Sequence, residues 1–269
     1  MDNSKESKHK FYTLGHNIGI HYYLPLKGQM PEYQAAGNFT SDEVKHCINF
    51  AFKLVNEKYD SQERPRKFIN YLQGSLAEYA VHKQLNEFNQ FNSNFPNLST
   101  LSKGDQGYDV IVNDKYRIQV KSLLVNFQLL LLEEHYYQQN KDNFDFLVEQ
   151  RINLHQSKSE LLKYVEQQFK DYGNYLNNPK NPLVNGIFAN KLANVDYELA
   201  RFMTKQELID NAKQLTLNPG IEIKKEVLQG NSSKLSEQNI VNALPKRTIV
   251  IEIKNMHPLS KLLNEIELR

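Results

Sequence analysis

An acid, an amide and a lysine lie close together in this sequence, and side chains of these types can hold a metal ion beside a phosphate. Asp109 lies in the segment 107–113, and Gln119 and Lys121 lie in the segment 116–122. An Asp carboxylate supplies a hard anionic oxygen to Mg²⁺, and a Gln side-chain carbonyl supplies a weaker, neutral one. A lysine beside the metal can orient or help deprotonate an attacking water and offset charge on a phosphoryl oxygen. These residue types predict metal-assisted phosphodiester hydrolysis.

Two strands joined by a tight turn must position these residues. Asn and Asp in the segment 113–115 favour a turn, because they tolerate left-handed backbone angles and hydrogen-bond locally. Side chains alternate between faces along a strand, so Gln119 and Lys121 share one face. If the three turn residues form the loop, Asp109 lies opposite Gln119. The same register faces two apolar pairs on the other side: Val110 with Ile118, and Val112 with Tyr116.

A further acid is carried by a predicted helix ahead of the hairpin. The segment 72–81 has helical character and contains Glu78. The residues three and four positions before it on the helix are Ser75 and Gly74, which are small. Small neighbours would permit the hairpin to approach Glu78 closely.

Asp109, the pair Gln119-x-Lys121 and the preceding Glu78 resemble the PD-(D/E)xK nuclease superfamily, which includes type II restriction endonucleases, junction resolvases and repair nucleases. The resemblance covers roughly residues 66 to 151, about a third of the chain. Two positions depart from the pattern: Tyr108 stands where a Pro is expected, and Gln119 stands where an acid is expected. A missing carboxylate weakens the hold on a divalent cation. Some restriction enzymes of the superfamily do carry Gln at this position.

The resemblance implies an α/β fold, with a restriction-endonuclease-like core of a central mixed β-sheet flanked by helices. It also implies a Mg²⁺-dependent type II endonuclease that cuts double-stranded DNA as a homodimer and leaves a 5′-phosphate and a 3′-hydroxyl. In this interpretation Asp109 binds the metal and Gln119 assists. Lys121 positions or activates water, and Glu78 makes an outer or second metal contact.

Three alternatives remain at the level of sequence. A nucleic-acid-binding or assembly subunit could keep this fold without catalysis, with Gln119 as the trace of the loss. A repair or junction nuclease would read the shape of DNA. An ordinary solvated hairpin would also show acid, amide and lysine on its exposed face. A second Glu-x-Lys, Glu252 to Lys254, shows how easily the half-motif arises, and we interpret it as the outward face of a late strand.

Composition fits an intracellular protein without a polyanion-coating tail. The 269 residues can bury a sizeable core, and the formal charge is +2. Cys47 is the single cysteine, which excludes disulfides within the chain and cysteine-based zinc clusters. The longest apolar run, residues 129–132, is far shorter than a membrane span. We therefore expect a cytoplasmic location and no membrane partner.

Turn signals and helical stripes predict three regions. Residues 1–39 are irregular, residues 40–215 form the nuclease-like core, and residues 216–269 form an appended region for DNA recognition or dimerisation. Capping boxes at Thr40 and Thr204 predict helix starts. An amphipathic helix is predicted near the carboxy terminus, over residues 258–268.

Overall fold

The computed structural model describes residues 35–60, 62–87, 93–94, 108–124, 129–155, 158–176, 192, 194–220 and 245–267. These residues form helices and mixed β-sheet, which confirms the predicted α/β fold class. Two compact units divide the chain. The core unit comprises Tyr33–Val125, Asn140–Leu208 and Met256–Arg269, and the second unit comprises Met1–Glu32, Asn126–Gln139 and Ile209–Asn255.

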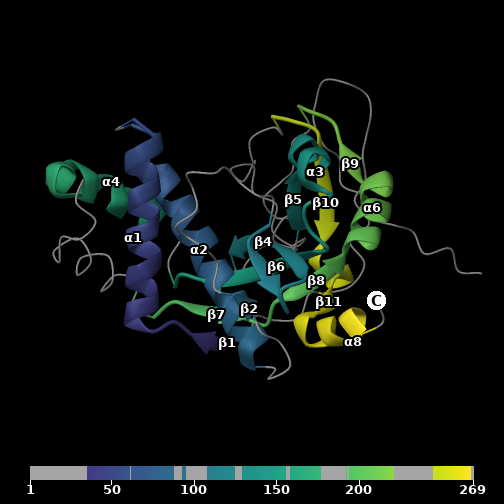
Figure 1. Ribbon diagram of the computed structural model, residues 1–269. Coiled ribbons are helices and arrows are strands. Elements are labelled where there is room, and N and C mark those ends of the chain that lie inside the picture. The colour runs from purple at the N-terminus through teal and green to yellow at the C-terminus, as the bar shows by residue number, and fades with distance from the viewer. Residues whose placement is uncertain are drawn as a thin grey trace, which may run out of the picture. The chain divides into compact units, whose positions relative to one another are not determined.

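The core unit is built on a mixed sheet (Figure 1). Its strands are β1 (Ala35–Asn38), β2 (Ser93–Asn94), β3 (Val110–Val112), β4 (Tyr116–Leu124), β6 (Phe146–Asn153), β7 (Asp196–Glu198), β8 (Arg201–Thr204) and β11 (His257–Pro258). The main path runs β1-β7-β6-β4-β3-β2, and β8 pairs with β6 and β11. The pairing of β4 with β6 is parallel and the other pairings are antiparallel. Strand β4 comes from the segment predicted as the second strand of the hairpin.

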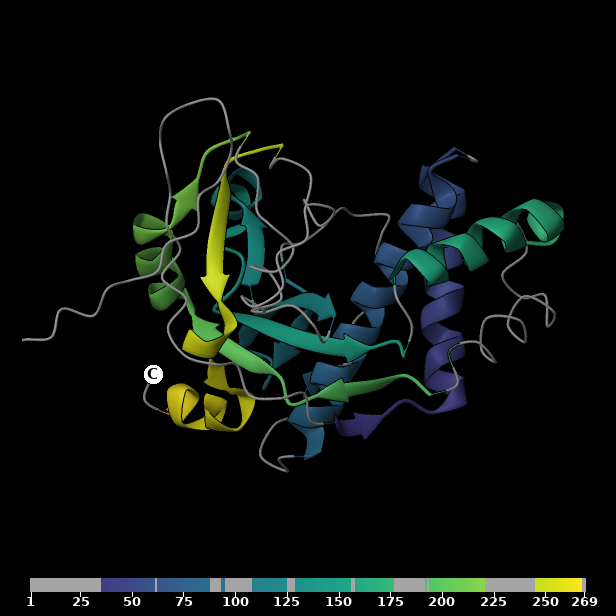
Figure 2. The same ribbon diagram turned by 180° about the vertical axis from the view of Figure 1, so that it is seen from behind.

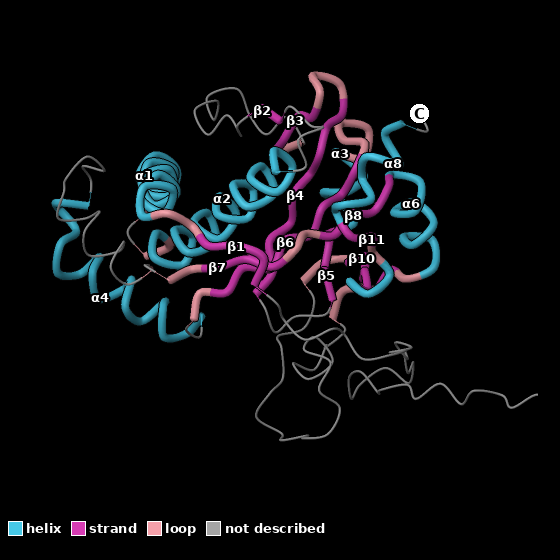
Figure 3. Tube along the Cα trace, turned by 90° about the horizontal axis from the view of Figure 1, so that it is seen from below, coloured by secondary structure: helices cyan, strands magenta, loops and turns pink. Residues whose placement is uncertain are grey.

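Helices cover one face of this sheet. They are α1 (Ser41–Lys58), α2 (Arg64–Glu87) and α4 (Lys158–Leu176). The predicted capping box at the start of α1 is confirmed, since Thr40 and Glu43 exchange side chain to backbone hydrogen bonds of 2.7 and 3.3 Å. Helix α2 packs along β4 and β6, and α1 packs against α2 (Figure 3). Their buried side chains join those of the sheet in one apolar core, where Cys47 is fully buried.

Every second residue of β4 and β6 points into that core. Ile118 and Val120 of β4 and Phe146 and Val148 of β6 belong to the same buried cluster as the apolar face of α2. The intervening residues, Gln119 and Lys121 among them, must face the other side of the sheet because side chains alternate along a strand. We call this other side the polar face of the sheet.

The strand that returns beside β6 is interrupted by a bulge. Glu149 pairs with Arg201 and Ile152 pairs with Tyr197, so two residues of β6 lie opposite three residues of the returning strand. Figure 2 shows the two parts of this strand, β7 and β8, in green beside β6. Amide side chains bind the backbone groups at the bulge. Gln84 of α2 accepts from the Ala200 N–H at 2.9 Å, and Gln150 donates to the Glu198 carbonyl at 2.8 Å.

The carboxy-terminal segment returns to the core unit. The predicted helix over residues 258–268 is shorter, because β11 and a 3₁₀ turn (Leu259–Lys261) precede α8 (Leu262–Glu267). Leu259, Leu262 and Ile266 are buried in the core cluster. The predicted cap at Thr204 is confirmed for α6 (Lys205–Gln214), where Glu207 accepts bonds from the Thr204 N–H and hydroxyl at 2.8 and 2.9 Å.

The second unit contains a three-stranded sheet in the order β5-β10-β9. Its elements are β5 (Leu129–Glu133), α3 (Glu134–Asn140), β9 (Thr216–Leu217), β10 (Thr248–Glu252) and a 3₁₀ turn (Ile253–Asn255). Glu252 ends the strand and Lys254 lies in the turn, with an ion pair of 3.1 Å between their largely buried side chains. The expectation that both point outward from a strand was therefore wrong.

The structure divides the chain differently from the expected boundaries at residues 40 and 216. Strand β10 pairs along its whole length with β5, which lies more than a hundred residues earlier, while residues 256–269 belong to the core unit. Ala35–Asn38 form a strand, although the region 1–39 was expected to be irregular. Residues 1–34 lie outside the described residues.

Candidate active site

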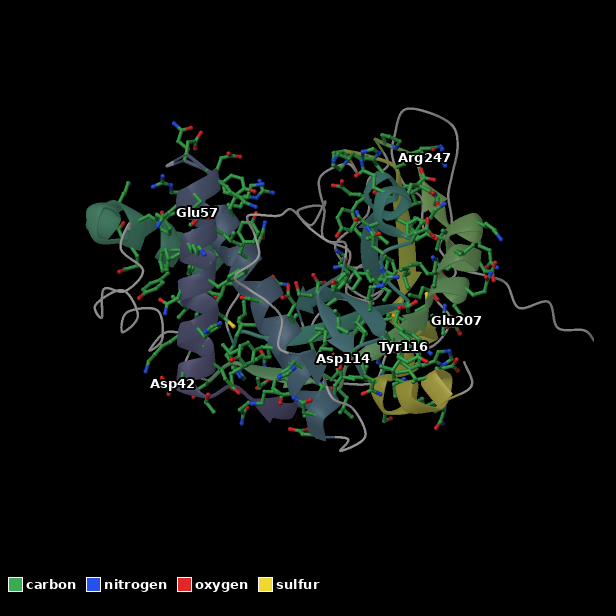
Figure 4. All side chains as sticks on the ribbon, in the orientation of Figure 1. Asp42, Glu57, Asp114, Tyr116, Glu207 and Arg247 are labelled. Carbon is green, nitrogen blue, oxygen red and sulfur yellow. The ribbon has the colours of Figure 1, made fainter. Side chains whose placement is uncertain are left out.

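The hairpin that carries the candidate site has the register predicted from the sequence. Val110 pairs with Ile118 and Val112 pairs with Tyr116. The turn closes through a 3.1 Å hydrogen bond from the Lys115 N–H to the Val112 carbonyl. Figure 4 labels Asp114 in this turn and Tyr116 at the start of β4. Asn113 and Asp114 have φ values of 51° and 54°, a left-handed conformation that Asn and Asp adopt more readily than other side chains.

Asp109 is fixed by three hydrogen bonds to the opposite strand. Its backbone N–H donates to the Ile118 carbonyl at 2.8 Å. Its side-chain Oδ2 accepts a bond of 2.6 Å from the Val120 N–H and a second bond from the Gln119 amide group. The predicted meeting of Asp109 with Gln119 is thus found. Because the backbone itself holds the carboxylate, its orientation is set by the fold of the hairpin.

The sequence predicted that Gln119 meets Asp109, but not that Gln119 acts as a hydrogen-bond donor there. Its side chain is only 3% exposed, and its NH₂ group donates to the Asp109 carboxylate. A glutamate at this position would have no N–H to offer and would place a second carboxylate against the first. The amide therefore suits its position as a partner of Asp109. Its carbonyl as a metal ligand stays a prediction.

Lys121 follows Gln119 by two residues and so lies on the same polar face. Its side chain is partly exposed. In the parallel pairing of β4 with β6, its register partner is Glu149, and Glu149 in turn pairs with Arg201 of β8. Register partners on neighbouring strands point to the same face. The polar face thus carries a row of a lysine, a glutamate and an arginine across three strands.

Glu149 is a residue that sequence reasoning did not single out. It is 1% exposed, and its Oε1 atom has no hydrogen-bond donor within the described parts of the chain. Burial raises the pKa of its carboxyl group to about 8, although the charges of Arg151 and Arg201 act in the opposite direction. An acid directly after the apolar residues 146–148 was a visible signal. The sequence did not show that Glu149 lies next to Lys121, because parallel strands pair across a long connection.

The next row of the polar face holds a second pair of opposite charges. Arg151 and Glu198 form an ion pair across β6 and β7, and both are almost fully buried. Glu149 therefore lies beside a guanidinium that is already paired with another carboxylate.

Glu78 occupies a partly buried position on α2. Its charge acts on Cys47 of α1, whose pKa rises to about 12, mainly through burial. Ser75 is buried, where its hydroxyl donates to the Leu72 carbonyl, whereas a Cβ on Gly74 would meet open space. Because α2 packs on the apolar face of the sheet, Glu78 approaches from the side opposite to Gln119 and Lys121. Its convergence with the other three residues stays a prediction.

The donor set on the polar face fits Mg²⁺ rather than a soft metal. No group of three or more His, Cys, Asp and Glu residues that could hold a metal occurs among the described residues. Mg²⁺ is commonly held by only one or two carboxylates together with water and substrate phosphates. The Asp109 carboxylate, the Gln119 amide and Oε1 of buried Glu149, which has no hydrogen-bond donor among the described residues, are oxygen donors of this kind. The residues present therefore fit the predicted ion.

Comparisons with known proteins give no relative for this chain. No family model, no curated protein and no solved structure matches it. Among the described helices, none has the length and apolar character needed to cross a membrane.

Proposed function

We propose that this protein is a Mg²⁺-dependent DNA endonuclease that resembles type II restriction enzymes and works in the cytoplasm. The hydrogen-bonded meeting of Asp109 and Gln119 in the predicted hairpin register supports the proposal best. A different register would separate these residues. A homodimer is the expected form, because cutting both strands of a palindromic site requires two copies of the site.

Each residue of the hairpin has a distinct task in this proposal. Asp109 holds the ion through its carboxylate, with Oδ2 anchored by the Val120 N–H. Gln119 fixes the carboxylate by donating to it. Lys121 orients the attacking water on the polar face and offsets charge on the phosphoryl oxygens. Glu78 has no task at the ion in this arrangement, because α2 carries it on the opposite face of the sheet. Mg²⁺ held by these residues would supply the Lewis acid that polarises the phosphodiester.

A second candidate function is DNA binding without cleavage. The neutral Gln119 favours it, since its amide group satisfies Asp109 without any metal. In this case the polar face would bind phosphate through Lys121 and through Arg201 of the same row. The two functions differ in what Lys121 does: catalysis requires its amine, whereas binding needs only positive charge.

Cleavage of plasmid and phage DNA, with Mg²⁺ or with a chelator, tests the proposal. Wild-type protein should give discrete fragments only with Mg²⁺, and Lys121→Ala should lower the cleavage rate by at least about 100-fold, the scale at which one positioned catalytic group acts. Lys254→Ala is the matched control, because Lys254 belongs to the other Glu-x-Lys of the chain. Its cleavage rate should equal that of wild type.

The outcomes separate the two candidates. DNA retention without cleavage by wild-type protein, together with weaker retention by Lys121→Ala, would support the binding function. Metal-dependent cleavage that survives in Lys121→Ala would contradict the assignment of the site.

A further inference from the structure

We infer that Glu149 supplies the second carboxylate of the metal site, in place of the charge that Gln119 lacks. This inference rests on the proposed function. It adds to the site a residue from β6, outside the sequence motif of the hairpin.

Glu149 lies on the same face of the sheet as the predicted metal-binding residues of the hairpin. Glu149 is the register partner of Lys121 on β6, and alternation puts both on the polar face with Gln119. Asp109 lies one strand from Gln119 on the other side. The two carboxylates thus flank β4, the strand that carries the lysine. Mg²⁺ keeps several waters when it binds to proteins, so a carboxylate can act on the ion directly or through its water shell.

One oxygen of the Glu149 carboxyl group is buried without a hydrogen-bond donor among the described residues. Glu149 is 1% exposed, and Oε1 has no hydrogen-bond donor in the described chain. A buried polar atom without a partner destabilises the fold. Such an atom requires a partner that the described residues do not supply, and a bound cation or its water is such a partner.

The neighbouring arginines do not provide that partner. Arg151 is paired with Glu198. Arg201 stands directly across from Glu149, yet its Nε has no hydrogen-bond partner among the described residues. If Glu149 served only to neutralise Arg201, its carboxylate would form an ion pair with that guanidinium. The arrangement instead leaves one oxygen of Glu149 for a ligand.

Metal binding without DNA separates a site residue from a structural one. Mn²⁺ serves as the probe, because its binding to the full-length protein can be followed by electron paramagnetic resonance. In Glu149→Gln we expect Mn²⁺ affinity to fall by about 10- to 100-fold, and DNA cleavage with Mg²⁺ to fall with it. Thermal unfolding of the metal-free variant should occur at or above the temperature of wild type, because the buried carboxyl group is gone.

Glu252→Gln is the matched control. Glu252 also belongs to a Glu-x-Lys and also has a buried Oε1 without a hydrogen-bond donor in the described residues, but it lies in the second unit. Its Mn²⁺ affinity should equal that of wild type. If Glu149→Gln does not fold, Glu149→Met removes both oxygens and allows the same measurement.

Two results would overturn the inference, and they differ. If wild-type protein binds Mn²⁺ and cleaves DNA while Glu149→Gln does both equally well, Glu149 is structural and the proposed function stands. If wild-type protein neither binds Mn²⁺ nor cleaves DNA, the proposed function fails together with the inference.

Discussion

At the scale of single residues, the Glu149 carboxyl group makes the folded state sensitive to pH. Its pKa is about 8 in the folded protein, against an ordinary value of 4.5. The folded state therefore binds this proton more tightly than the unfolded state does. Stability must fall as pH rises from about 4.5 to about 8. Each pKa unit corresponds to about 1.4 kcal/mol, so the whole effect amounts to several kcal/mol.

Glu149→Gln should remove this pH dependence. We expect the free energy of unfolding of wild-type protein, from urea denaturation without metal, to decrease between pH 5 and pH 8.5 more steeply than that of the variant. An equal slope for both proteins would mean that Glu149 is not protonated at neutral pH. Adding Mg²⁺ at pH 8 should reduce the difference, if the ion pairs with the carboxylate.

Local rules predicted one half of the candidate site and not the other. The contact of Asp109 with Gln119 followed from strand alternation and from the turn chemistry of Asn113 and Asp114, all within a short stretch of chain. The neighbourhood of Glu149 depends on the pairing of β4 with β6, which are separated by β5 and α3. The sequence predicted which residues of each strand share a face, but it did not predict which strands pair.

At the scale of elements, Gln84 joins α2 to the interrupted strand. It donates to the Gln150 side chain at 2.7 Å and to the Glu198 carbonyl at 3.3 Å, and it accepts from the Ala200 N–H. A bulge leaves backbone groups outside the regular ladder, and these two glutamines satisfy them. The hydrogen bonds at the bulge explain why a polar side chain, Gln84, is buried on this helix.

Gln84→Leu should destabilise the core unit by about 2–3 kcal/mol, because it leaves buried backbone and amide groups without partners. Urea denaturation gives the free energy of unfolding, and hydrogen exchange should show faster exchange of the Ala200 N–H. Gln138→Leu, at an exposed position on α3, is the control and should change stability by less than about 0.5 kcal/mol. A loss no greater than in the control would contradict the role assigned to Gln84.

At the scale of the whole molecule, the two units are interleaved along the chain. The second unit takes β5 from the middle of the sequence and β10 from near its end, and the last residues return to the core unit. The sequence predicted helices, strands and caps well where their patterns are local. Turn signals after residue 215 predicted an appended region there, but turn signals are local and do not show which distant strands pair.

Truncation after residue 215 should therefore prevent normal folding of the remaining chain. The shortened chain lacks β10, the partner of β5, and it lacks Leu259, Leu262 and Ile266 of the core cluster. We expect it to lose the near-ultraviolet circular dichroism of the full-length protein and cooperative unfolding. A truncated chain that keeps both would show that residues 216–269 are a separate appendage.

Leu262→Ala in the full-length chain measures the core contribution alone. Removal of this buried side chain should destabilise the protein by about 2–5 kcal/mol without abolishing cooperative unfolding.

The bulge between β7 and β8 limits whether residues can be deleted from the chain at this point. Glu198 and Arg201 are three positions apart, an odd number, so in a regular strand they would point to opposite sides. Only the extra residue lets both face their partners on β6. Leu199 is 57% exposed and resembles a surface residue that could be deleted without harm. Its deletion would reverse the sidedness of one half of the strand, so substitutions at Leu199 are tolerable whereas the number of residues there is fixed.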